Sequence, residues 1–148
     1  MGGRPLRKRL LREAPHRTFI LRLEKGEEVV GALTSLASTE GIRAAELSGI
    51  GAFESAVIGF YDLEAQEYDR IPVEEETEVL SLLGNLSVTD EGPRVHAHVS
   101  LGRRDGSGLG GHLFEARSGA TLEVFVREEP GELRRTPDAA AGLPLLDL

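Results

Sequence analysis

The chain has 148 residues, of which 40% are hydrophobic, 28% charged and only 5% aromatic, and its formal net charge is -8. This length and balance predict one globular domain whose core is built mainly from aliphatic side chains. The absence of cysteine excludes disulfides, thiolate metal ligands and cysteine nucleophiles. Scarce side-chain amides and the lack of cysteine also hint at a thermophilic source.

A basic segment precedes an acidic body. Residues 1–25 carry eight Lys/Arg and two Glu, whereas the remainder of the chain is strongly acidic. The acidic body argues against general attraction to nucleic acid or anionic lipid, although the basic segment could contact phosphates. We favour a solvated edge strand, or packing against acidic residues such as Glu74, Glu75 and Glu76. No apolar run is long enough to cross a bilayer or to form a signal-peptide core, so we expect a cytoplasmic protein.

The first elements are a strand and a helix. Residues from Arg17 to Glu24 alternate between apolar and polar and predict a strand. Between Glu27 and Glu40, apolar residues recur at three- and four-residue spacing, which predicts a helix with one apolar face. Glu27 and Glu28 suit the positive N-terminal end of this helix, and Gly41 suits its C-terminal cap.

The rest of the chain is mainly strand-like. Short turn signals separate six runs: Ala44–Ile50, Ser55–Asp62, Gln66–Pro72, Thr77–Val88, Arg94–Leu101 and Ala120–Arg127. Most connections are too short for parallel crossovers, so we expect an α+β fold with a mainly antiparallel sheet and a helix packed on one face. Leu109 to Ser118 fits a short helix or a strand equally well. The tail from Pro130 is either loosely ordered or strapped across a neighbour by Leu143, Leu145 and Leu146.

Three of the four histidines lie close together in the sequence. His96 and His98 are two residues apart in a predicted strand, so both side chains project from the same face. His112 follows a Gly110-Gly111 step, which allows close backbone approach or positive φ. If the chain brings His112 back beside the other two, three neutral nitrogens converge in the open arrangement of a catalytic-type zinc site.

Other interpretations of these histidines remain open. A lone pair of histidines is more often structural than metal-binding. No carboxylate fills a standard ligand position, although Glu123 in the following strand and Asp105 in the preceding turn are candidates for a ligand, an orienting group or a general base. His16, in the basic segment, has no evident partner.

Several motifs in a fixed order carry a family resemblance. They are Gly26-Glu27-Glu28-Val29-Val30, Gly41-Ile42-Arg43-Ala44-Ala45, Ser48-Gly49-Ile50-Gly51-Ala52, Leu82-Leu83-Gly84-Asn85-Leu86-Ser87, Pro93 with His96-Ala97-His98-Val99-Ser100-Leu101, Gly110-Gly111-His112-Leu113 and Thr121-Leu122-Glu123-Val124. In this series the chain resembles the PPC domain (plant and prokaryote conserved). The resemblance divides the chain into a basic arm (1–16), a PPC-like domain (17–128) and a C-terminal tail (129–148).

The resemblance carries expectations about assembly and function. It implies an α+β fold, a homotrimer, and a metal site, zinc or another divalent ion, at His96, His98 and His112. It also implies DNA binding, a label that comes largely from plant members with an AT-hook, of which only Gly3-Arg4-Pro5 remains here. We therefore expect a trimeric binding module, with a small zinc-dependent enzyme or a small-molecule sensor at the same histidines as the alternatives.

Overall fold

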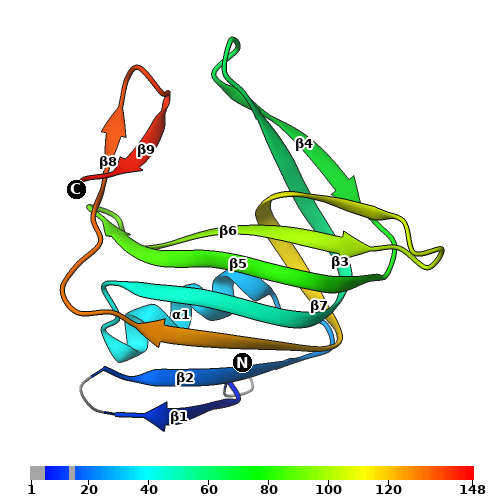
Figure 1. Cartoon of the computed structure of the whole chain (residues 1–148), viewed down its shortest axis with the longest axis horizontal. Coiled ribbons are helices and arrows are strands. Elements are labelled where there is room, and N and C mark those ends of the chain that lie inside the picture. The colour runs from blue at the N-terminus through cyan, green and yellow to red at the C-terminus, as the bar shows by residue number, and fades with distance from the viewer. Residues whose placement is uncertain (1–5, 14–15) are drawn as a thin grey trace, which may run out of the picture.

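The computed structural model describes residues 6–13 and 16–148, so the partial AT-hook motif lies outside the described residues. The described chain folds into one helix and nine strands (Figure 1). In chain order these are β1 (Lys8–Arg12), β2 (Thr18–Glu24), α1 (Val29–Glu40), β3 (Ala45–Asp62), β4 (Glu67–Val73), β5 (Thr77–Thr89), β6 (Gly92–Gly102), β7 (Gly108–Glu128), β8 (Arg135–Asp138) and β9 (Leu143–Leu146). Within these residues there is no helix with the length and apolar character that a membrane span needs.

The helix forms where the apolar spacing predicts it. Glu28 is its N-cap, and its carboxylate accepts hydrogen bonds from the backbone N–H groups of Val30 and Gly31. Gly41 ends the helix in the left-handed conformation, with a φ of 66°. The buried residues of the helix are Val29, Leu33, Leu36 and Ala37. This face packs against β6 and β7 and joins the main hydrophobic core.

The main sheet is antiparallel and has the strand order β1-β2-β7-β6-β5-β3-β4. Strand β7 also pairs with β3, so that β3, β5, β6 and β7 close into a ring. In Figure 1 the helix lies behind this part of the sheet. The α+β fold with a helix on a mainly antiparallel sheet is confirmed.

Two strands are longer than the sequence pattern predicts. The runs Ala44–Ile50 and Ser55–Asp62 form one continuous strand, β3, and the ambiguous segment 109–118 joins Ala120–Arg127 in β7. The predicted breaks were wrong because the local irregularities are bulges. The β3–β7 register shifts between Gly51 and Phe53, where Gly51 has a φ of 149°. A bulge bends and twists a strand without ending it.

The described part of the basic arm contains an edge strand, as favoured from the sequence. Strand β1 pairs with β2, and Arg7 forms an ion pair with Glu24 at 2.7 Å. Lys8 forms an ion pair with Glu40 at the end of the helix. These two cations do pack against acidic residues, but the partners lie on β2 and α1 and are not the suggested residues 74–76.

The C-terminal tail is an ordered hairpin. Strands β8 and β9 pair with each other, and the backbone N–H of Val88 donates to Leu133 O at 2.8 Å, which ties the hairpin to β5. The β8–β9 hairpin and the β3–β4 hairpin rise on the same side of the sheet (Figure 1). Their tips are joined, because Tyr61 Oη donates to Ala141 O at 2.6 Å and Gln66 Nε2 donates to Ala140 O at 2.7 Å. The two hairpins therefore flank the middle of β6.

Candidate metal centre

The three histidines meet on neighbouring strands, as the sequence predicts. His96 and His98 project from the same side of β6, and His112 on β7 lies directly opposite His98. The ring centroids are 5.2 Å apart for His96 and His98, 5.4 Å for His96 and His112, and 5.5 Å for His98 and His112. One ring nitrogen from each residue lies within 4.8 Å of the other two. The imidazoles thus form a nearly equilateral triangle.

The glycine before His112 allows this arrangement through close approach of the backbone. β7 is paired with β6 on one side and with β3 on the other at this point, because His112 lies opposite both His98 and Gly59. A Cβ on Gly111 would lie 2.5 Å from the carbonyl oxygen of Gly59. The φ of Gly111 is not positive. Glycine is therefore required here by the close approach of the Gly59 backbone and not by a left-handed conformation.

His112 lies in an aromatic environment. Its ring centroid is 4.8 Å from that of Tyr68 and 4.7 Å from that of Phe114. Burial lowers the pKa of His112 to about 4, and the positive charges of the neighbouring histidines and of Arg94 and Arg70 act in the same direction. His112 is therefore neutral at pH 7. Its buried Nδ1 has no hydrogen-bond partner.

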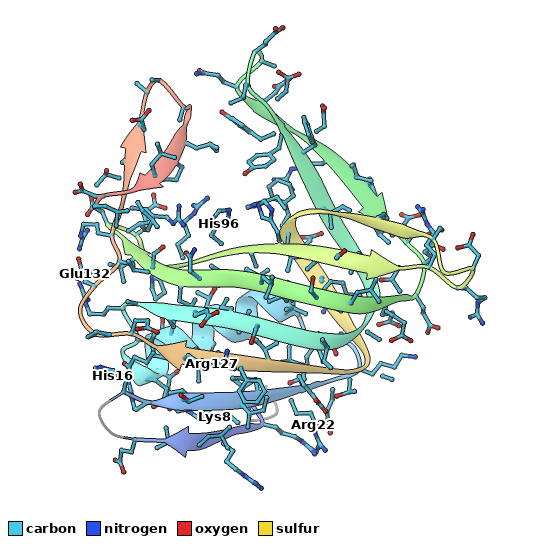
Figure 2. All side chains as sticks on the ribbon, viewed as in Figure 1. Lys8, His16, Arg22, His96, Arg127 and Glu132 are labelled. Atoms are coloured by element: carbon cyan, nitrogen blue, oxygen red, sulfur yellow. The ribbon has the colours of Figure 1, made fainter. Side chains whose placement is uncertain are left out.

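His96 has an arginine beside its ring. Arg135 Nη2 on β8 lies 3.1 Å from His96 Nδ1. Burial is the main cause that lowers the pKa of His96, followed by the charge of Arg135. A guanidinium can only donate hydrogen bonds, so His96 Nδ1 must be the acceptor and the ring proton of neutral His96 must be on Nε2. Figure 2 shows His96 on the side of β6 that the two hairpins flank.

Neutral groups hold Arg135 in this position. Its Nε donates to Ser87 Oγ at 3.0 Å, its Nη2 to Asn85 Oδ1 at 3.0 Å, and its Nη1 is 3.4 Å from Pro144 O. Asn85 on β5 is the register partner of His96, so strand pairing places it there. Only 9% of Arg135 is exposed. Burial lowers the pKa of its guanidinium, with Arg94 as the second cause.

The structure does not bring the candidate carboxylates to the histidines. Asp105 lies in the turn between β6 and β7, where it accepts hydrogen bonds from the backbone N–H and the hydroxyl of Ser107. Glu123 lies in the other half of β7, opposite Arg22 of β2. Among the described residues, the metal-ligating group here consists of the three histidines alone.

The residues present fit a transition metal ion. Three neutral imidazoles are typical ligands of zinc and of similar divalent ions, and three protein ligands leave a further position open. The unpartnered, buried Nδ1 of His112 is a polar atom that a ligand or ion could satisfy. Hard cations such as magnesium and calcium prefer oxygen ligands, which this cluster lacks.

The sequence did not identify the residues that surround the histidines. Asn85 could have been found, because the turn at Asp90-Glu91 sets the β5–β6 register and pairs Asn85 with His96. Arg135 is distant from the histidines in sequence, and no local pattern places a tail residue over β5. Tyr68 is likewise positioned by the long β3–β4 hairpin rather than by a motif.

The fold and the site define a class of protein: a small α+β domain with three histidines on the open side of its sheet. The family model of the Plants and Prokaryotes Conserved (PCC) domain matches residues 12–130. The chain therefore belongs to this family, which is the one that its sequence motifs resemble. A search of curated proteins found no match.

Solved structures of similar proteins cover nearly the whole chain. A metal-containing protein from Archaeoglobus fulgidus is 39% identical and has a TM-score of 0.84, over 99% of this chain and 100% of its own. A plant- and prokaryote-conserved protein from Pyrococcus horikoshii is 34% identical with a TM-score of 0.84, over 100% and 98% of the two chains. A proposed DNA-binding protein from Bacteroides thetaiotaomicron is 28% identical with a TM-score of 0.87, over 95% and 96%.

Proposed function

We propose that this protein is a homotrimeric binding module that holds a divalent transition metal ion, zinc in the first instance, through His96, His98 and His112. The observation that carries the proposal is the triangle of imidazoles, with one nitrogen of each within 4.8 Å of the other two. Lowered pKa values keep His96 and His112 neutral at pH 7, which is the form that binds metal. The relative from Archaeoglobus fulgidus, a metal-containing protein, supports the proposal.

A metal-binding module is better supported than a hydrolytic zinc enzyme. The open coordination position resembles that of catalytic zinc sites. Such an enzyme also needs a general base within reach of the reacting group. The two carboxylates considered for that role, Asp105 and Glu123, lie in the β6–β7 turn and in the distant half of β7.

Metal analysis of untagged protein tests this proposal. We expect wild-type protein supplied with zinc and then desalted to retain about one equivalent per chain. His98 is exposed, so His98→Gln should fold normally and retain little zinc. His16→Gln is the matched control, because His16 lies far from the cluster (Figure 2). Less than about a tenth of an equivalent in wild-type protein would contradict the proposal.

An exposed apolar strip supports the trimer. Leu83 on β5 is the register partner of His98, and Ser48 of β3 lies between Leu83 and Phe125 of β7. Leu83 is 57% exposed, Phe125 37% and Ile50 60%. Apolar side chains exposed close together on one face are typical of a protein interface. The strip lies beside His98, so a neighbouring copy would cover the edge of the metal centre.

Sedimentation tests the assembly. We expect wild-type protein to sediment as a trimer and Leu83→Lys to sediment as a smaller species. Leu63 at the tip of the β3–β4 hairpin is 78% exposed, and Leu63→Lys is the control that should leave the trimer intact. A monomeric wild-type protein at micromolar concentration would contradict the proposed assembly.

The charges of the described arm give little support to DNA binding. DNA affinity depends on cations that are available to neutralise phosphates. Arg7 and Lys8 already form ion pairs with Glu24 and Glu40 of the same chain. If the arm nevertheless carries DNA affinity, deletion of residues 1–12 should abolish it and its salt dependence.

A further inference from the structure

Three arginines surround the histidine cluster. Arg135 contacts His96, and the Arg70 guanidinium lies 3.9 Å from the ring centroid of Phe114, which itself packs on His112. Arg94 is two residues before His96 on β6, so its side chain projects from the same face. The charge of Arg94 also contributes to the pKa values of His96, His112, Tyr68 and Arg135.

These three arginines have no ion-pair partner within the described chain. The charged groups that lower the pKa of His96 are Arg135, His98 and Arg94, and those that lower the pKa of His112 are His96, His98, Arg94 and Arg70. None of the ion pairs found in residues 6–13 and 16–148 includes one of these three arginines. A divalent ion would add two further positive charges to a partly buried site, where like charges are costly.

Metal binding also changes the role of Arg135. An imidazole nitrogen that coordinates a metal uses the lone pair that would accept a hydrogen bond. If the metal uses His96 Nδ1, it displaces Arg135 Nη2 directly. If the metal uses Nε2, the ring proton moves to Nδ1, where it faces a second donor. In both cases the contact between Arg135 and His96 is lost and a guanidinium N–H is freed at the edge of the centre; this N–H lies beside the metal position when the metal uses Nδ1.

From these observations we propose that the centre binds a small carboxylate together with the metal ion, and that Arg135 and Arg94 hold the carboxylate's negative charge. This inference rests on the proposed metal site. A carboxylate has two oxygens on one carbon, so one can coordinate the metal while the other accepts from the released guanidinium N–H. Asn85 and Ser87 keep Arg135 at the edge of the centre throughout.

The strand geometry favours a carboxylate over a phosphate. Phosphate sites in proteins commonly use helix N-termini or concave runs of free backbone N–H groups. Here the three histidines lie on strands whose backbone groups are engaged in sheet pairing, and the helix begins on the other side of the sheet. The donors that remain are the planar guanidinium groups, which can pair with two oxygens of a carboxylate or of a phosphate, so the preference for a carboxylate rests on the engaged backbone N–H groups of these strands.

Linked binding of Co²⁺ and acetate tests this inference. The dissociation constant of Co²⁺ is measured on full-length, untagged protein in perchlorate medium, with and without acetate at equal ionic strength, after correction for Co²⁺–acetate complexes. We expect acetate to tighten Co²⁺ binding about tenfold and to change the visible absorption of the bound Co²⁺, because the two ligands bind cooperatively. Phosphate at the same concentration should have a smaller effect.

Variants assign the effect to the arginines. Arg135→Gln should bind Co²⁺ without acetate at least as tightly as wild type, because a competing cation is removed, and should lose the acetate effect. Arg94 is exposed, so Arg94→Gln tests the same charge in a variant that folds normally. Arg134→Gln is the control, because Arg134 pairs with Asp90 and Glu132.

The outcomes separate the two proposals. If wild-type protein does not bind Co²⁺ in either medium, the proposed metal site is wrong. If it binds Co²⁺ with an affinity and a spectrum that acetate does not change, the metal site stands and the carboxylate inference is overturned. A larger effect of phosphate than of acetate, or an acetate effect that persists in both arginine variants, would also overturn it.

Discussion

His112 should make the stability of the metal-free protein depend on pH. Its folded pKa is about 4, whereas the ordinary value is 6.5, because burial disfavours the charged ring. A histidine with a lowered folded pKa contributes stability that is present above pH 6.5 and is lost as the pH falls toward 4. We therefore examine His112→Phe, since the neighbouring rings of Tyr68 and Phe114 can pack against an aromatic side chain of similar size.

The magnitude follows from the two pKa values. One pKa unit corresponds to about 1.4 kcal/mol. Between pH 7 and pH 4.5 the unfolded chain binds a proton that folded His112 does not, which lowers the free energy of unfolding by about 2 kcal/mol after allowance for the partial exposure of the ring. We expect wild-type protein to lose about 2 kcal/mol more stability over this interval than His112→Phe does. At pH 7 the variant should be as stable as wild type, because the substitution removes a buried nitrogen that has no partner.

Urea unfolding in EDTA at the two pH values provides the measurement. The comparison between variants cancels the titration of other groups that both proteins share. His16→Phe is the matched control for replacing a histidine by phenylalanine, because His16 lies in the arm far from the cluster. If wild-type protein and His112→Phe lose the same stability between pH 7 and pH 4.5, His112 is not held neutral by the fold and the reasoning fails.

Two further substitutions test the frame that positions the site. Arg17 donates to Glu128 through Nε and Nη2, each at 2.7 Å. Arg17→Met should therefore lower the free energy of unfolding at pH 7 by about 1–2 kcal/mol, and this loss should shrink at acidic pH as the Glu128 carboxylate is protonated. Urea titrations that show no change at pH 7 would refute this prediction. A Cβ on Gly84 would lie 2.1 Å from a β6 carbonyl oxygen, so thermal melts of Gly84→Ala should show a loss of about 3 kcal/mol or more in the free energy of unfolding. A Cβ on Gly108 would lie 3.7 Å from its nearest neighbour, so Gly108→Ala should change stability little. Equal melting temperatures for the two variants would refute this prediction.

The sequence predicted the local part of the site well. The positions of His96 and His98 follow from the two-residue period of a strand, and the helix from its apolar spacing and caps. The meeting with His112 required only that the chain return along a neighbouring strand after the turn at 103–106, which is the simplest antiparallel connection. Short-range periodicity and turn chemistry were sufficient for this much of the molecule.

The parts that failed depend on long-range contacts. The surroundings of the histidines come from residues distant in sequence, such as Arg135 and Tyr68, and no local pattern pairs them with β6. The tail could not be interpreted because its hairpin is fixed by Tyr61 and by β5, not by its own composition. The two predicted strand breaks failed because glycines mark bulges as readily as turns.

The charge distribution distinguishes two kinds of anionic partner. The protein as a whole carries a formal charge of -8, yet Arg70, Arg94 and Arg135 lie on the side of the sheet that holds the three histidines. A polyanion such as DNA must lie along many side chains, so the acidic body opposes it over most of the contact. A small anion experiences mainly the groups within a Debye length, about 8 Å at physiological salt, and at the histidines these include Arg135, which contacts His96. The same chain can therefore disfavour nucleic acid and still attract a carboxylate to its histidines.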